Sequence, residues 1–165
     1  MRKFILLFIA SIICSFTSYA QQEQKIGTDG FYIGMSKLDM LGELGKMGGF
    51  KLDEKFEAEN AYNLSYTKVY KNNDQLGYTF SIEDAFDTVF CIYKYYVTFN
   101  RSFIEDVYNK KLADMIYAYG QPIVAGKTSS TWRLKGYIIS LKWSGETFNG
   151  IVTYAIEESY QQVFN

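Results

Sequence analysis

Histidine is missing from this 165-residue chain, which removes both the commonest general base and the commonest zinc ligand. A serine nucleophile would then need a lysine as its base, but Ser36 and Lys37 stand at adjacent positions that diverge. The carboxylates gather in short groups at 53–59, 83–87 and 157–158, without the ligand spacing of a calcium-binding loop. We therefore expect a protein that is not an enzyme and has no catalytic residues, metal site or cofactor.

The first twenty residues have the pattern of a secretory signal peptide. Arg2 and Lys3 precede an apolar run too short to span a bilayer, and Ser18 and Ala20 supply the small residues that signal peptidase recognises. Cleavage after Ala20 would take two of the 17 basic residues away and leave 15 against 18 acidic ones. We expect an exported protein in the periplasm, at the cell surface or secreted; an uncleaved anchor helix is the alternative.

Charge and hydropathy narrow the classes further. The formal net charge of the whole chain is −1, which gives no basic surface for nucleic acid. Beyond the signal peptide no apolar stretch reaches the length of a membrane span, so we expect no integral membrane protein. Removal of the signal leaves Cys91 as the one cysteine, so no intramolecular disulfide could form and the fold would depend on its core.

The elements predicted after the signal follow one order twice. Ser36–Asp39 and Ser102–Glu105 have the capping-box pattern that begins a helix, and Gly48 and Gly120 end the two helices. Strand-like alternation follows each helix, first at 62–70, 76–82 and 88–99, then at 131–135, 137–143 and 150–157. This order predicts an α+β fold, a tandem helix-strand-strand-strand repeat forming a six-stranded antiparallel sheet with two helices on one face.

A single α+β domain is thus expected over residues 31–160, with residues 21–30 as a flexible leader. Residues 31–100 and 101–160 would be its two repeats, and a chance succession of the same elements is the alternative to duplication. Gly34-Met35-Ser36, with the later Gly120-Gln121-Pro122, resembles the BamE (SmpA/OmlA) and β-lactamase-inhibitor-protein-like group. The first copy lacks that group's proline and the second lacks its Gly-Met-Ser opening. The resemblance implies an exported fold whose sheet grips another protein without catalysis.

The aromatic content, 15 Tyr and 13 Phe, gives the candidate site. Strict alternation along residues 88–99 puts Cys91, Tyr93 and Tyr95 under the helices, with Cys91 as a core residue. The other side of the sheet would then expose a mixture of apolar and basic side chains that is typical of protein interfaces. Its candidate partner-binding residues are Phe90, Ile92, Lys94, Tyr96, Arg133, Ile138 and Lys142.

Two functions fit this sequence. The first is a non-catalytic module that binds another exported or envelope protein through the open sheet face, or forms a homodimer through it. The alternative is a periplasmic protein that binds a small molecule, lipid or glycan in an aromatic-lined pocket between sheet and helices. A closed pocket above roughly 300 Å³ that is lined by tyrosine residues would favour the alternative, and a tightly filled core would favour the first.

Overall fold

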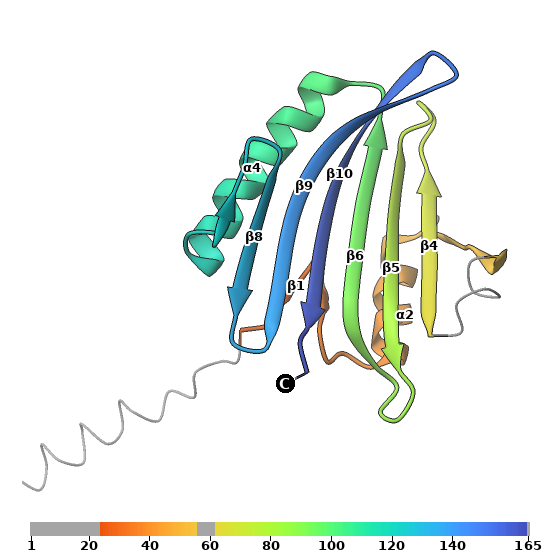
Figure 1. Ribbon diagram of the computed structural model, residues 1–165. Coiled ribbons are helices and arrows are strands. Elements are labelled where there is room, and N and C mark those ends of the chain that lie inside the picture. Colours follow the sequence, from red (N-terminus) through yellow and green to blue (C-terminus); the bar gives the residue numbers. More distant parts are fainter. Residues whose placement is uncertain (1–23, 56–61, 165) are drawn as a thin grey trace, which may run out of the picture.

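An antiparallel eight-stranded sheet forms the centre of the computed structural model, which describes residues 24–55 and 62–164 (Figure 1). The strands run in the order β3-β4-β5-β6-β10-β9-β8-β7. Their bounds are β3 Lys51–Leu52, β4 Asn63–Val69, β5 Gln75–Glu83, β6 Thr88–Thr98, β7 Val124–Ala125, β8 Ser129–Leu134, β9 Tyr137–Phe148 and β10 Ile151–Gln162. The predicted signal peptide, residues 1–20, lies outside the described residues.

The α+β class is confirmed, with an antiparallel sheet and two helices, but the predicted number of six strands is wrong. The two additional strands, β3 and β7, are the outermost strands of the sheet, and each is only two residues long. A two-residue strand shows no alternation of polar and apolar side chains, so the sequence pattern gives no sign of it. Short outer strands also offer little edge to other chains.

Helices α2 (Lys37–Met47) and α4 (Arg101–Tyr119) lie on the same side of the sheet, behind it in Figure 1. The start of α2 is as predicted, since the Ser36 hydroxyl accepts a 3.1 Å hydrogen bond from the amide of Asp39. The predicted start of the second helix at Ser102 is wrong. Asn100 is the N-cap, and its side chain accepts from the amide of Phe103 at 3.1 Å.

A β-bulge decides which side chains of β6 face the helices. Ser81 pairs with Cys91 but Ile82 pairs with Val89, so Phe90 has no partner on β5. One extra residue reverses the alternation of every residue beyond it. The predicted assignment of faces is therefore wrong for most of β6. Beyond the bulge Ile92, Lys94 and Tyr96 face the helices, and Cys91, Tyr93, Tyr95 and Val97 lie on the opposite face, which we call the open face.

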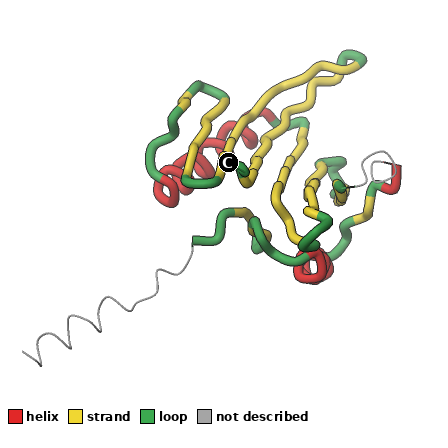
Figure 2. The backbone as a smooth tube through the Cα atoms, turned by 60° about the horizontal axis from the view of Figure 1, so that its bottom comes forward, coloured by secondary structure: helices red, strands yellow, loops and turns green. Residues whose placement is uncertain are grey.

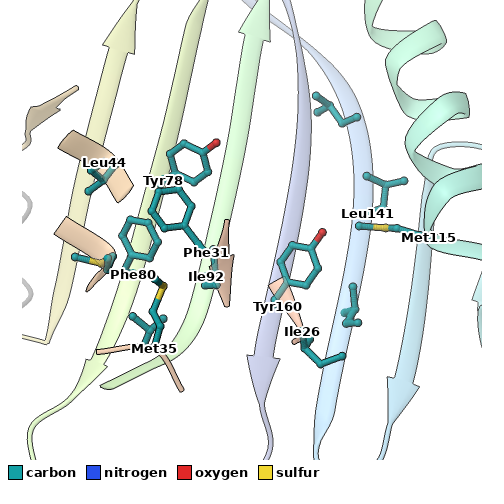
Figure 3. Packing of buried hydrophobic residues seen from close by; sticks show 14 of the residues in the cluster. Ile26, Phe31, Met35, Leu44, Tyr78, Phe80, Ile92, Met115, Leu141 and Tyr160 are labelled. Carbon is teal, nitrogen blue, oxygen red and sulfur yellow. The ribbon is translucent and has the colours of Figure 1, made fainter. Parts of the chain in front are cut away.

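The N-terminal hairpin of β1 (Gly27–Thr28) and β2 (Phe31–Tyr32) packs on the helix side of the sheet. Phe31 lies with its ring centroid 5.0 Å from that of Tyr78 and 4.9 Å from that of Phe80, and both of those residues belong to β5 (Figure 3). Ile26 is buried as well. The leader expected over residues 21–30 is thus part of the fold from Ile26 onward, because Ile26 and the adjoining Phe31 are buried behind the sheet.

Candidate functional site

Three of the seven predicted contact residues lie on the helix side, so their predicted exposure on the open face is wrong. Ile92 has 0% of its surface exposed and belongs to the core. Lys94 is held in ion pairs, and the Tyr96 hydroxyl donates a hydrogen bond to the buried carboxylate of Asp74. The Tyr96 ring also packs against Phe103 of α4, with centroids 5.7 Å apart. These side chains stabilise the fold and are not available to a partner on the open face.

The other four predicted residues lie in or beside the open face. Phe90 is the extra residue of the bulge, is half-buried, and contacts the ring of Phe164. Arg133 pairs with Ile138 across β8 and β9, and Lys142 lies further along β9 with 53% of its side chain exposed. Their sequence neighbours Trp132, Ile139 and Leu141 are buried towards α4, which leaves Arg133, Ile138 and Lys142 on the other side.

A hollow of about 190 Å³ lies in the open face over the central strands. Its floor is made by small residues, Ala155 of β10 and its pairing partner Ser144 of β9. Its other lining residues are Tyr93, Tyr95, Val97, Glu146, Thr153 and Glu157. Sequence reasoning missed this hollow, because strict alternation had placed its tyrosines under the helices.

Tyr95 lies across the neighbouring strand, and this orientation leaves the space over Ala155 open. Its ring covers Gly77 of β5, and its hydroxyl shares a 2.8 Å hydrogen bond with Thr67 of β4. Glycine is required at this point, because a side chain at position 77 would occupy the place of the ring. The sequence Leu76-Gly77-Tyr78 within an alternating strand was a signal for such a close approach, since glycine is otherwise unfavourable in a strand.

The charged side of the hollow is formed by Glu157 and Glu146. The Tyr93 hydroxyl hydrogen-bonds to Glu157, and burial together with this carboxylate raises the pKa of Tyr93. Lys142 approaches Glu157 only to 3.9 Å, the outer limit of an ion pair. Within the described residues the side chain of Glu146 makes no hydrogen bond or ion pair. The hollow therefore combines two phenol rings, whose centroids are 6.1 Å apart, with two carboxylates.

A two-stranded ribbon extends from this hollow. Beyond Trp143 of β9 and before Tyr154 of β10 the two strands pair only with each other among the described residues. The ribbon projects past its neighbours (Figure 1). Phe148 and Ile151 pair with each other next to its turn, with 77% and 57% of their surfaces exposed. The open face thus continues into an apolar tip.

The helix side contains a cluster of charges at the centre of the sheet. The Nζ of Lys94 lies 2.7 Å from Asp29 and 3.1 Å from Glu158, and the Nζ of Lys111 lies 3.0 Å from Glu158. The hydroxyl of Tyr160 also donates to Glu158, at 2.7 Å. Each charge in the cluster has a partner of opposite sign, which is the arrangement of a structural ion network. The network fixes the N-terminal hairpin to β6, β10 and α4.

Ionisation within this cluster follows from its pairing. Burial acts to raise the pKa of Asp29, but the charge and hydrogen bond of Lys94 outweigh burial and hold this pKa below its ordinary value. Burial acts to lower the pKa of Lys94, and Glu158 and Asp29 together raise it above its ordinary value. Asp29 and Lys94 therefore both stay charged at neutral pH.

A second cleft, of about 360 Å³, lies where the N-terminal hairpin meets the ends of β9 and β10. It is lined by Lys25, Tyr32, Tyr137 and Gln162 with four neighbours of the hairpin, Gln24, Ile26, Ile33 and Gly34. The Nζ of Lys25 lies 3.9 Å from the centre of the Tyr32 ring. The cleft thus has two tyrosine rings at its wall, Tyr32 and Tyr137. The rings of Phe31, Tyr78 and Phe80 instead pack against one another in the core.

The described residues contain no group of three or more acidic or cysteine side chains arranged to hold a metal ion. Nor does any helix of residues 24–55 and 62–164 have the length and apolar character needed to cross a membrane. The fold is of the α+β class, and helices α2 and α4 both lie on the side of the sheet opposite the open face (Figure 2). No protein-family model, curated protein or solved structure matches the chain.

Proposed function

We propose that this protein is an exported, non-catalytic module that binds another protein of the envelope through the open face of its sheet. The observation that carries this proposal is the continuity of the hollow with the ribbon. Tyr93, Tyr95 and Val97 line the hollow, and Phe148 and Ile151 lie on the same face at the tip. These five residues replace Ile92, Lys94 and Tyr96 as the proposed centre of the contact. The polar pair Glu146 and Thr153 joins the hollow to the tip.

The composition of this surface supports binding to a protein. Tyrosine, phenylalanine and aliphatic side chains form its apolar part, with Arg133 and Lys142 on β8 and β9 beside them. Glu146 lies between the hollow and the tip. Protein interfaces commonly have an aromatic and apolar centre with a charged rim. The predicted signal peptide and the absence of histidine from the sequence support export and a role without catalysis.

The order of the strands supports the proposed duplication. Four strands follow α2 and four follow α4, and in the sheet the two sets mirror each other about the contact between β6 and β10. A duplicated unit of this kind would place the last strand of each copy at the centre. We likewise propose the resemblance to the BamE and β-lactamase-inhibitor-protein-like group. It would make the sheet the surface that binds another protein.

Site-specific photo-crosslinking in the organism that encodes the protein tests the proposal. A photoreactive phenylalanine analogue at position 97 or 148 should give one discrete crosslinked protein, which is then identified and purified. The matched control is position 117, since Tyr117 on α4 is 95% exposed but on the other side of the sheet. The purified partner should bind wild type and lose affinity for Tyr93→Asp. Equal crosslinking at position 117, or none at 97 and 148, would contradict the proposal.

Binding of a small molecule is the second candidate, and the cleft at the N-terminal hairpin is the observation that favours it. Its volume of about 360 Å³ is within the range of ligand sites. Tyr32 and Tyr137 would supply rings for stacking on a sugar or lipid. A ligand that co-purifies with wild type and is lost from the Tyr137→Ala variant would support this candidate.

A further inference from the structure

We propose that the hollow over Ala155 receives a single basic side chain, a lysine or arginine, of the partner protein. This inference rests on the proposed function, because it names the chemistry by which the open face recognises its partner. The argument has three parts: the size of the hollow, the rings at its side and the carboxylates at its rim.

The size of the hollow suits one long side chain. About 190 Å³ is well below the range of roughly 300–1,000 Å³ found for drug-sized ligands. The space exists because Ala155 and Ser144 are small and Tyr95 lies aside over Gly77. Its floor is therefore sheet backbone and small side chains, against which the methylene stem of a lysine or arginine can pack.

The rings favour a cation. Tyr93 and Tyr95 line one side of the hollow with their centroids 6.1 Å apart. A lysine or arginine head group within about 6 Å of such a ring is attracted by its quadrupole, and the guanidinium group also stacks on it. A neutral apolar side chain would gain only the burial of its surface there.

The carboxylates give the preference for positive charge. Glu157 is 26% exposed at the side chain, pairs directly with Tyr95 across the strands, and is close to Tyr93. Glu146 lies two residues beyond Ser144 on the same face of β9, and its carboxylate is free of partners within the described residues. Within the described part of the chain, Lys142 is the one basic group that forms an ion pair with either carboxylate, and it stays 3.9 Å from Glu157. A cation that came closer would displace it. A negative side chain in the hollow would meet two like charges.

Titration of the purified protein with N-acetyl-arginine amide, followed by the nuclear magnetic resonance signals of the Tyr93 and Tyr95 rings, tests the inference. We expect saturable shifts with a Kd in the millimolar range, as suits an isolated side chain. N-acetyl-citrulline amide, the neutral equivalent, should bind at least roughly fivefold more weakly. Glu146→Gln and Glu157→Gln should each weaken arginine binding by roughly threefold. Asp106→Asn, which removes a charge from the exposed side of α4, should leave it unchanged.

Several results would overturn the inference. They are equal affinity for arginine and citrulline, no saturable shift of either ring, or arginine binding that the two glutamine variants do not affect. Tighter binding of tetramethylammonium than of the arginine amide would assign the hollow to a small organic cation instead of a partner side chain. Crosslinking at positions 97 and 148 is independent of these results, so the inference can fail while the proposed binding face stands.

Discussion

The ring of Tyr95 covers the α-carbon of Gly77, its pairing partner on β5. A β-carbon added to Gly77 would lie 2.1 Å from the Cζ atom of that ring. The two residues are therefore coupled. Glycine at 77 determines where the Tyr95 ring lies, and the position of the ring determines the shape of the hollow over Ala155.

Gly77→Ala should consequently lower the free energy of unfolding by roughly 1–3 kcal/mol, the usual cost of overpacking. The reason is that the alanine methyl and the Tyr95 ring cannot occupy the same space. Urea denaturation measures the effect, and the same substitution made in a Tyr95→Ala background serves as its control. An equal cost in both backgrounds would show that the ring is not the cause.

Lys94→Met should destabilise the protein by about 3–5 kcal/mol, since it leaves the carboxylates of Asp29 and Glu158 without their shared cation. Glu158 retains Lys111, which keeps the loss from being larger. The matched control is Lys142→Met on the open face, where the ion pair is long and the lysine is half exposed. That substitution should change stability by no more than about 0.5 kcal/mol. Similar costs for both variants would contradict a structural role for the buried network.

Acid should weaken the attachment of the N-terminal hairpin. The pKa of Asp29 is lower in the folded protein than its ordinary value of 3.8, so its contribution is complete above that value. The contribution is lost as the pH falls through the lower pKa of the folded state. Denaturation curves recorded from pH 7 to pH 3 should show stability falling below about pH 4. Asp29→Asn should show a shallower decrease over the same interval, and an unchanged slope would exclude Asp29 as a source of the dependence.

Two substitutions at the start of α4 distinguish between its two candidate capping residues, Asn100 and Ser102. Asn100→Ala should cost about 1 kcal/mol, because the amide of Phe103 loses its hydrogen-bond acceptor. Ser102→Ala should have a much smaller effect, since the Ser102 hydroxyl only donates to the Asn100 side chain. Thermal or urea unfolding of both variants measures the difference. The opposite order would restore the capping box at Ser102 that the sequence indicates.

Local patterns in the sequence predicted the kinds of elements well. The helix after Ser36, the long strand at 88–99 and the hairpin of the last two strands all depend on neighbouring residues, and the structure has each of them. The connection predicted over 144–149 is wrong, since β9 continues to Phe148. The surface was predicted less well. Arg133, Ile138 and Lys142 lie on the open face, whereas Ile92, Lys94 and Tyr96 do not. The difference has one physical cause, the bulge at Phe90, which the sequence does not mark.

The amino-acid sequence alone determined the α+β class, the two helices and the order of the long strands, because capping and alternation act over a few residues. Tertiary structure decided the two-residue outer strands, the burial of the segment from Ile26 onward and the face on which each β6 side chain lies. These features depend on which residue of a distant strand stands opposite, and a shift of one residue exchanges the two faces of a strand.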